Sequence, residues 1–222
     1  MRILVYVEGP GDRASLEKLF RPLVEEGRKS KVSLTLHHRD GKDWLLHQLG
    51  RTAANHLKSN PDDYVFALPD LYPMAKYART PAAHDSFADM RTFLLERFRE
   101  AADGYDLPDA VRSHYRVHCL KHDLEVLLLG APDVLRRRLG TEDGIEKNWR
   151  KPPEDQNDNR PPKSVVKELF HKYRKKTPYT ETLDAPWILE RASADELCRT
   201  CPQNFRPLHT ELSRLVRGES PE

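Results

Sequence analysis

The sequence predicts a Rossmann-like α/β fold, in which helices flank a mostly parallel sheet, followed by a helical C-terminal extension. Along the first 140 residues, short apolar segments rich in β-branched residues alternate with amphipathic segments of about ten residues or more. This alternation is typical of β-α-β units, whose parallel strands are covered by helices on both faces. The chain then changes character, because residues 141–163 are polar and contain four prolines.

Four strands are expected. Residues 2–7 are β-branched and aromatic and stop at a Gly/Pro cluster, which predicts a fully buried strand. Residues 32–37 alternate between apolar and polar side chains, which predicts a strand with one covered face. Residues 64–68 predict a third strand that ends at Pro69-Asp70, and residues 115–119 predict a fourth.

Helices are expected between these strands. Asp12 is placed to cap the first helix, and Pro22 is expected to kink it. Apolar residues at helical spacing predict further helices over residues 44–57 and 83–101, and one through Leu124, Leu127 and Leu128 directly after the fourth strand. These helices complete the α/β core.

The C-terminal part is expected to be an extension packed on the core. We place the core at residues 1–140 and the extension at residues 141–222. The extension begins with the long polar loop over residues 141–163. A basic amphipathic helix around residues 165–173 and a helix pair near 193–199 and 203–216 are expected to follow.

Composition limits the class of protein. The chain has 222 residues, of which 38% are hydrophobic and 32% are charged. This is sufficient for a buried core and excludes a chain that is disordered throughout. Because 37 Lys and Arg face 35 Asp and Glu, the formal net charge is only +2. That balance excludes a uniformly basic nucleic-acid coat and an acidic tail protein.

Nothing in the sequence predicts export or membrane insertion. No apolar run has the length of a membrane helix, and residues 1–7 lack the length and the cleavage site of a signal peptide. The chain has three cysteines, Cys119, Cys198 and Cys201. Three is an odd number, and a chain of this length does not need disulfides for stability. We therefore expect a reduced, cytoplasmic protein, and we interpret the isolated Cys198-x-x-Cys201 pair as helix-end thiols rather than a zinc site.

Acidic residues follow three of the four predicted strands. Glu8 and Asp12 follow the first strand, Asp70 the third, and Asp123 and Glu125 the fourth. Ligands of parallel sheets bind at the carboxyl ends of the strands, so these five carboxylates are expected to share one rim. A hard cation relieves the repulsion between clustered carboxylates. We predict that all five hold Mg²⁺ or Mn²⁺ for phosphodiester chemistry, with Glu8, Asp70 and Glu125 as the catalytic residues.

Each acidic residue also has a structural interpretation. Asp12 and Asp123 each fit a helix N-cap as well as they fit a metal ligand, and Asp70 fits an Asx turn. Glu8 is harder to explain structurally, because a charge between a buried strand and a glycine is costly unless it is paired or functional. His122 fits a general base, a phosphate contact or a linker residue.

Basic residues are concentrated over residues 136–176. This segment has 13 Lys and Arg and 7 Asp and Glu, an excess of six, while the rest of the chain has 24 basic and 28 acidic residues and carries −4. A basic patch of this kind fits a phosphate backbone, and a solvated helix face is the alternative. The residues assigned to nucleic-acid binding are Arg136, Arg137, Lys163, Lys167, Lys175 and Lys176.

Several short motifs, in order along the chain, resemble the DUF4276 family, a Toprim-like group often met in mobile and anti-phage defence loci. They are Val7-Glu8-Gly9-x-x-Asp12, Asp70-Leu71-Tyr72-Pro73, His122-Asp123-Leu124-Glu125-Val126-Leu127-Leu128, Pro153-Glu154-x-x-Asn157, Pro161-Pro162-Lys163-Ser164 and Cys201-Pro202-Gln203-Asn204-Phe205. The resemblance implies a Toprim-like fold with a Mg²⁺-dependent nuclease site. It implies that Glu8 is the general acid/base or a metal ligand, that Asp70 is a ligand, and that Asp123 and Glu125 complete the cluster.

The chain departs from this pattern at three positions. Tyr72 stands where Toprim enzymes usually carry a second aspartate after the third strand. Ser164 follows Lys163 instead of preceding it, and no glycine follows Tyr179. Two-metal catalysis would therefore require Glu125 or Asp12 in place of the missing aspartate.

The function predicted from these features is a metal-dependent phosphodiesterase or nuclease that acts on DNA or RNA as the effector of an anti-phage defence module. Two alternatives stay open. One is a catalytically silent interaction subunit that binds an ATPase partner or a phage component through the C-terminal helices and uses the acidic residues only as helix caps. The other is a small-molecule phosphatase or nucleotide hydrolase that uses the same rim. The expected partners are nucleic acid and an ATPase, a homodimer is compatible with the sequence, and no membrane is involved.

Overall fold

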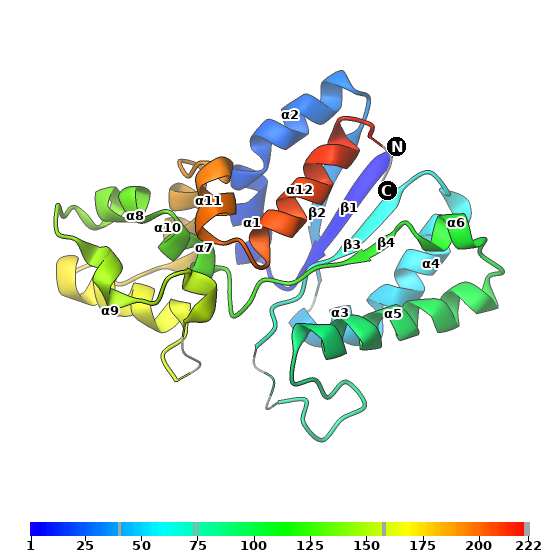
Figure 1. Ribbon diagram of the computed structural model, residues 1–222, viewed down its shortest axis with the longest axis horizontal. Coiled ribbons are helices and arrows are strands. Elements are labelled where there is room, and N and C mark those ends of the chain that lie inside the picture. The colour runs from blue at the N-terminus through cyan, green and yellow to red at the C-terminus, as the bar shows by residue number, and fades with distance from the viewer. Residues whose placement is uncertain (40, 73, 75, 157–158, 220–222) are drawn as a thin grey trace.

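A single parallel sheet with helices on both faces forms the centre of the molecule (Figure 1). The computed structural model describes residues 1–39, 41–72, 74, 76–156 and 159–219. The strands are β1 (Arg2–Val7), β2 (Ser33–His38), β3 (Tyr64–Ala67) and β4 (Tyr115–Val117). They pair in the order β2-β1-β3-β4, and every pair is parallel. The predicted parallel α/β fold is confirmed, and each strand begins and ends within two residues of its predicted bounds.

The helices are more numerous than the periodicity predicts. Their bounds are α1 (Pro10–Leu19), α2 (Arg21–Lys29), α3 (Gly41–His47), α4 (Leu49–Ser59), α5 (Phe87–Gly104), α6 (Asp109–Arg112), α7 (Glu125–Gly130), α8 (Pro132–Leu139), α9 (Pro162–Tyr173), α10 (Glu181–Leu189), α11 (Ala194–Thr200) and α12 (Phe205–Val216). Instead of a kinked first helix there are two, because Pro22 lies in the first turn of α2, where its missing N–H costs no hydrogen bond. Helices α6, α8 and α10 were not predicted, and the single helix expected over residues 44–57 is divided into α3 and α4.

The side chains of β1 divide the core into two layers. Ile3, Val5 and Val7 pack in the layer that contains α1, α2 and the C-terminal helices. Leu4 and Tyr6 pack in the layer formed with α3, α4 and α5. Because successive side chains of a strand point to opposite faces, an uninterrupted apolar strand such as β1 requires cover on both sides.

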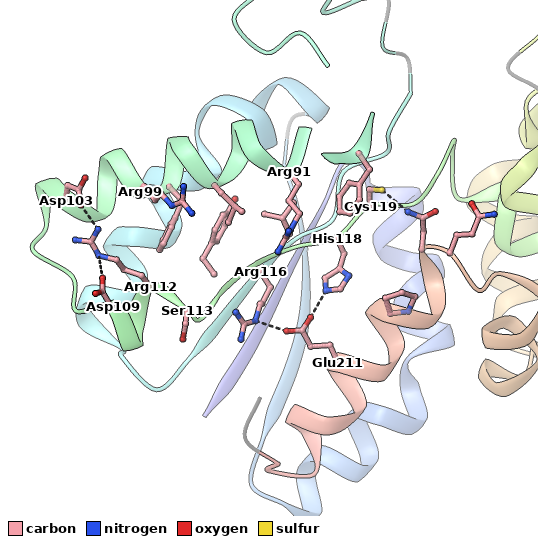
Figure 2. Close-up of a pocket in the computed structure, with 18 residues that line it drawn as sticks. Arg91, Arg99, Asp103, Asp109, Arg112, Ser113, Arg116, His118, Cys119 and Glu211 are labelled. Carbon is pink, nitrogen blue, oxygen red and sulfur yellow. Dashed lines mark hydrogen bonds and ion pairs between the residues drawn. The ribbon is translucent and has the colours of Figure 1, made fainter. Parts of the chain in front are cut away.

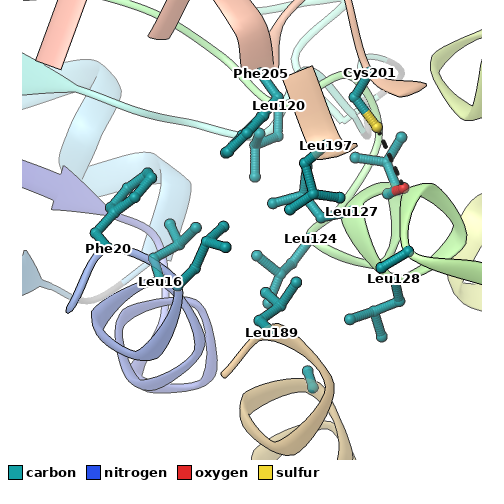
Figure 3. Packing of buried hydrophobic residues seen from close by; sticks show 14 of the residues in the cluster. Leu16, Phe20, Leu120, Leu124, Leu127, Leu128, Leu189, Leu197, Cys201 and Phe205 are labelled. Atoms are coloured by element: carbon teal, nitrogen blue, oxygen red, sulfur yellow. Dashed lines mark hydrogen bonds between the residues drawn. The ribbon is translucent and has the colours of Figure 1, made fainter. Parts of the chain in front are cut away.

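The C-terminal helices share their core with one face of the sheet. In Figure 1, α7 to α11 lie together at one end of the molecule, and α12 returns to pack beside α2. Leu124 and Leu127 at the start of α7 belong to the same apolar cluster as Leu16, Leu189 and Phe205 (Figure 3). The segment from α7 onward is therefore held against α1 by apolar packing, which positions the residues that follow β4.

The polar segment over residues 141–163 is anchored despite its composition. It contains two short 3-10 turns, η1 (Ile145–Asn148) and η2 (Pro153–Asp155), and the side chains of Ile145 and Trp149 are buried. Glu154 is only 1% exposed and accepts hydrogen bonds from the backbone N–H groups of Gln203 (2.7 Å) and Asn204 (2.6 Å). A carboxylate at a helix N-terminus is favoured by the helix dipole, so Glu154 fixes this segment onto the start of α12.

None of the three cysteines forms a disulfide. Cys119, Cys198 and Cys201 are free thiols, and the first and last of these are buried. Across the described ranges, no helix combines the length and the apolar character that crossing a membrane requires.

Candidate functional site

The acidic residues predicted as ligands meet at the carboxyl edge of the sheet. Glu8 follows β1 directly, and its Oε1 accepts a 2.9 Å hydrogen bond from the backbone N–H of Asp70. Asp70 in turn forms an isolated parallel bridge with Leu120, so the chain that leaves β4 runs beside the chain that leaves β3. This bridge carries the segment with Asp123 and Glu125 toward Glu8 and Asp70.

Asp12 is not the N-cap residue of α1, which was its structural interpretation. The N-cap of α1 is Gly9, and Asp12 is the third residue of the helix. Its Oδ2 accepts a 2.9 Å hydrogen bond from the backbone N–H of Gly9, which is the return half of a capping box. Only one of its two carboxylate oxygens takes part in this bond, so Asp12 can cap α1 and still offer an oxygen to the cluster.

Asp123 is also not an N-cap. The residue at the N-cap of α7 is Leu124, and no side chain caps that helix. Asp123 Oδ1 is buried and has no hydrogen-bond partner among the described residues. A buried carboxylate oxygen without a donor is costly, and either a proton or a bound cation would relieve that cost.

Glu125 is buried at the start of α7 and is held by two residues of the C-terminal extension. It is 1% exposed, and its Oε1 accepts a 2.9 Å hydrogen bond from the hydroxyl of Tyr179. The same oxygen lies 3.6 Å from Lys163 Nζ. Lys163 also forms an ion pair with Glu181, so one ammonium group bridges two carboxylates.

Glu181 and Tyr179 are site residues that the sequence did not identify. A Cβ added at Gly11 would lie 2.9 Å from Glu181 Oε1, so this glycine allows Glu181 to approach the first turn of α1. Both residues lie more than 50 positions after Glu125, in a region without strand signals. The one sequence feature near them was the absence of a glycine after Tyr179. This is a departure from the family motif, and it does not indicate that Tyr179 contacts Glu125.

Burial and mutual repulsion raise the pKa values of the carboxyls nearest to β1. Burial raises the pKa of Glu8 to about 7, against the opposing effects of the Asp70 N–H and the charge of Lys42. Burial, followed by the charge of Glu181, raises the pKa of Asp12 to about 6. These carboxyls therefore keep protons at a pH at which exposed carboxyls would be ionised.

The carboxyls after β3 and β4 are perturbed in the same direction. Burial and then the charge of Glu8 raise the pKa of Asp70 well above its usual range, and Asp12, Asp123 and Glu125 add to the effect. Burial and then Glu125 raise the pKa of Asp123 to about 8. All of the sequence-predicted carboxylates thus lie within electrostatic reach of Asp70.

The donor set of this cluster suits a hard divalent cation. Every donor is a carboxylate oxygen, the ligand type that Mg²⁺ and Mn²⁺ prefer. Within residues 1–39, 41–72, 74, 76–156 and 159–219, no three His, Cys, Asp or Glu side chains approach closely enough to form a preassembled metal cage. Mg²⁺ commonly takes one or two carboxylates and completes its shell with water and phosphate oxygens, and the orphaned oxygen of Asp123 fits that mode.

Tyr72 and His122 form an aromatic pair beside the cluster. Their rings stack with centroids 4.7 Å apart and an interplanar angle of 8°. Tyr72 therefore supplies a ring, not a carboxylate, at the position of the absent second aspartate. His122 is buried and has a positive φ of 69°. Pro73 and Asn157, which complete two of the motifs, lie outside the described residues.

A buried lysine on the other side of the cluster was also missed. Lys42 in α3 is 5% exposed, and its Nζ donates a 2.8 Å hydrogen bond to the carbonyl of Leu71. Burial lowers its pKa, while the charges of Glu8 and Asp70 raise it. Lysines are rarely buried, so no sequence signal places Lys42 beside these acids.

The structure divides the predicted nucleic-acid-binding residues into two groups. Arg136 is ion-paired with Asp133 and Glu146, and Lys163 lies among the carboxylates. Arg137 in α8, Lys167 in α9, and Lys175 and Lys176 after α9 are exposed. The segment is therefore less uniformly cationic than its composition indicates.

Two solved structures are similar over nearly the whole chain. The C-terminal region of the Burkholderia pseudomallei OLD protein has 18% sequence identity and a TM-score of 0.48, covering 97% of this chain and 98% of that chain. The C-terminal region of the Xanthomonas campestris pv. campestris OLD protein has 14% identity and a TM-score of 0.48, covering 96% and 95%. The curated proteins contain no match.

The family match covers most of the sequence. The family described as "Domain of unknown function (DUF4276)" matches residues 7–213. This range contains every motif on which the resemblance rested, from Val7 to Phe205. The chain therefore belongs to the DUF4276 family.

Proposed function

We propose that the protein is a Mg²⁺- or Mn²⁺-dependent phosphodiesterase that cleaves DNA or RNA in an anti-phage defence module. The observation that supports this proposal is that five carboxyl groups gather at the carboxyl edge of the sheet and that the pKa of each is raised, first by burial and also by neighbouring carboxylates. They belong to Glu8, Asp12, Asp70, Asp123 and Glu125. Clustered, desolvated carboxylates are costly to fold, and binding a cation is the function that offsets this cost.

The residues of the cluster have distinct roles in this proposal. A bound divalent cation supplies a Lewis acid that activates water and stabilises charge on the scissile phosphate. One or two of the carboxylates of Asp70, Asp123 and Glu125 would hold that cation, with water and phosphate oxygens completing its shell. Glu8, whose pKa of about 7 lies near neutral pH, would accept a proton from the attacking water. Lys163, which is half-buried between Glu125 and Glu181, contacts a phosphate oxygen of the substrate.

Cleavage assays with matched variants test the role of Glu8. Supercoiled plasmid and total RNA are incubated with Mg²⁺ or Mn²⁺ and with the wild type, Glu8→Gln or Glu25→Gln. Glu25 is exposed on α2 and makes the same change of charge outside the cluster. We expect Glu8→Gln to lose at least about 100-fold in rate, as for other general bases, and Glu25→Gln to match the wild type. Equal rates for Glu8→Gln and the wild type would show that Glu8 is not catalytic.

A parallel screen identifies the substrate class. If nucleotides are hydrolysed by the wild type and polynucleotides are not, the enzyme is a nucleotide hydrolase that uses the same carboxylates. Cleavage of polynucleotides with intact nucleotides supports the nuclease.

A second candidate function is a catalytically silent interaction subunit. The observation that favours it is the position of Lys163, which partly neutralises Glu125 and Glu181 without any metal. In this alternative the chain works as a homodimer or with an ATPase partner. Calorimetry distinguishes the two, because the subunit would bind neither Mg²⁺ nor Mn²⁺ at millimolar concentration.

We propose that the protein acts in a reducing compartment, the cytoplasm. The support is its free thiols, and in particular Cys198, which is half-buried and three residues from Cys201. A protein held in an oxidising compartment would expose this thiol to oxidation.

A further inference from the structure

A cavity of about 660 Å³ lies along β4, one of the two edge strands of the sheet, between α5 and α12 (Figure 2). A second cavity, of about 480 Å³, adjoins it. The two share Arg91, Arg116, Pro207 and Glu211 in their linings. We call the two cavities together the arginine groove. Nothing in the carboxylate cluster described above uses it.

Arginines line both helical walls of this groove. On α5, Arg91, Leu95 and Arg99 lie four residues apart and therefore on one side of the helix. On α12, Arg206 and Arg214 line the adjoining cavity. Arg116 projects from β4 between the helices, as Figure 2 shows. The groove thus presents guanidinium groups along its length on both sides.

Every acidic residue that lines the groove takes part in an ion pair. Glu219, in the adjoining cavity, pairs with Arg217 at 2.7 Å. Asp103 and Asp109 both pair with Arg112. Glu211 pairs with Arg116 at 2.7 Å and with His118 at 2.6 Å, and Figure 2 shows both contacts. These pairs involve none of Arg91, Arg99 and Arg206.

Three arginines of the groove have no ion pair with any residue in the described part of the chain. They are Arg91, Arg99 and Arg206, and all three side chains belong to exposed residues. Arg91 and Arg99 are eight residues apart on one helix, which corresponds to about 12 Å along its axis. Guanidinium groups spread over this length and over two walls fit an extended polyanion better than a small anion, which would occupy a single point.

We propose that the arginine groove binds the phosphodiester backbone of a nucleic-acid strand and is the surface along which substrate reaches the carboxylate cluster. The inference rests on the proposed function and adds a substrate path to it. Arginine forms bidentate hydrogen bonds with phosphate, which suits this task. A second copy of this chain is a poor occupant, because it would present the same unpaired arginines.

The position of the groove relative to the cluster supports a path. One end of the groove is lined by Cys119 and Asn204, whose Sγ and Nδ2 are 3.1 Å apart. The next residue, Leu120, forms the parallel bridge with Asp70, and its carbonyl accepts a 3.0 Å hydrogen bond from the backbone N–H of Leu71. A nucleic-acid strand that lies along β4 and runs in the direction of that β-strand therefore reaches Asp70.

Binding measured without cleavage tests this proposal. Fluorescence anisotropy with a labelled single-stranded 20-mer, in EDTA, compares the wild type with Arg91→Gln/Arg99→Gln/Arg206→Gln. The matched control is Arg28→Gln/Arg51→Gln/Arg79→Gln, which removes three exposed arginines outside the groove. Because the substituted side chains are exposed, the fold is expected to persist, and thermal melting of each variant verifies it.

The expected result is a loss of at least about 10-fold in affinity for the groove variant and little change for the control. The slope of log K against log salt concentration should also become shallower by about 2, because each contact with a single-strand phosphate contributes about 0.7 to this slope and three arginines are removed. Equal affinity of the groove variant and the wild type, or no binding of nucleic acid by the wild type, would overturn the proposal.

Two further measurements distinguish the groove from a different nucleic-acid surface and from a protein-docking site. If Arg137→Gln/Lys175→Gln/Lys176→Gln loses the binding instead, the sequence-predicted patch is the nucleic-acid surface and the groove is not. If a polyglutamate peptide binds more tightly than the 20-mer, the groove is a docking site for an acidic protein. The variant Glu8→Gln separates this test from the test of the proposed function, because it should bind the 20-mer as the wild type does. If Glu8→Gln cleaves at the full rate while the groove variant loses binding, the proposed catalytic role of Glu8 is refuted and the proposed groove is not.

Discussion

The carboxylate of Glu8 accepts a hydrogen bond from the backbone N–H of Asp70, across a distance of 2.9 Å. This contact joins the ends of β1 and β3, which are neighbours in the sheet, and it draws two acidic residues together. The same side chain therefore has a structural task and, in the proposed function, a catalytic one. Substitutions of Glu8 can separate the two.

We expect Glu8→Ala and Glu8→Gln to differ in stability. Glutamine keeps an acceptor for the Asp70 N–H and removes one charge from the cluster, so the free energy of unfolding should be unchanged or higher. Alanine leaves the N–H without an acceptor, which costs about 1–3 kcal/mol. Urea denaturation of both variants provides the measurement. Equal stability of the two would show that the hydrogen bond contributes nothing to the fold.

Divalent metal should stabilise the protein through the carboxylate cluster. At a free Mn²⁺ concentration ten times Kd, binding to the native state alone adds about 1.4 kcal/mol, which corresponds to an increase in Tm of about 3–5 °C for a chain of this size. EDTA should reverse the increase. Asp123→Asn, which alters the orphaned buried carboxylate, should show a smaller increase, while the exposed control Glu25→Gln should behave as the wild type does. An identical Tm with and without Mn²⁺ would contradict a cluster that holds metal.

Glu154 should be among the most important polar residues for stability. It receives N–H groups from the start of α12 at 2.6 and 2.7 Å, and it is almost completely buried. Glu154→Ala leaves these donors unsatisfied, and we expect a loss of about 2–4 kcal/mol, with a smaller loss for Glu154→Gln. The exposed residue Glu142 in the same segment is the control, and Glu142→Ala should change stability by less than about 0.5 kcal/mol. Chemical denaturation measures all three.

Asp63 should make stability depend on pH in the acid range. Burial by itself would raise the pKa of Asp63, but hydrogen bonds from the Arg2 backbone N–H, from His56 and from the Arg2 guanidinium outweigh it and lower the pKa. A carboxyl with a lowered folded pKa contributes stability that is present above its unfolded pKa of about 3.9 and is lost as the pH falls through the folded value. The free energy of unfolding should therefore fall below about pH 4.

The variant Asp63→Asn isolates this contribution. It should be less stable than the wild type at pH 6, and the difference in stability should narrow as the pH falls below about 4. Denaturation curves at a series of pH values measure the difference. A constant difference over this range would show that folding does not lower the pKa of Asp63.

Much of this architecture follows from local sequence pattern. Alternating apolar segments determined the four parallel strands, because burial on both faces requires continuous apolar residues such as those of residues 2–7. The same topology placed Glu8, Asp70 and Asp123 near one edge of the sheet, since parallel strands end on the same side. The split between α1 and α2 was missed, because a proline in a helical pattern is equally compatible with a kink and with a new first turn.

Only the tertiary structure decided which side chains meet. Lys163 bridges Glu125 and Glu181, and Arg91 and Arg206 line one groove although 115 positions separate them (206 minus 91). Local spacing determines which side of a helix a residue occupies, but it does not state what that side packs against. The sequence alone therefore determined a parallel sheet with an acidic carboxyl edge, whereas long-range packing decided which cations neutralise that edge and which arginines stay available for a ligand.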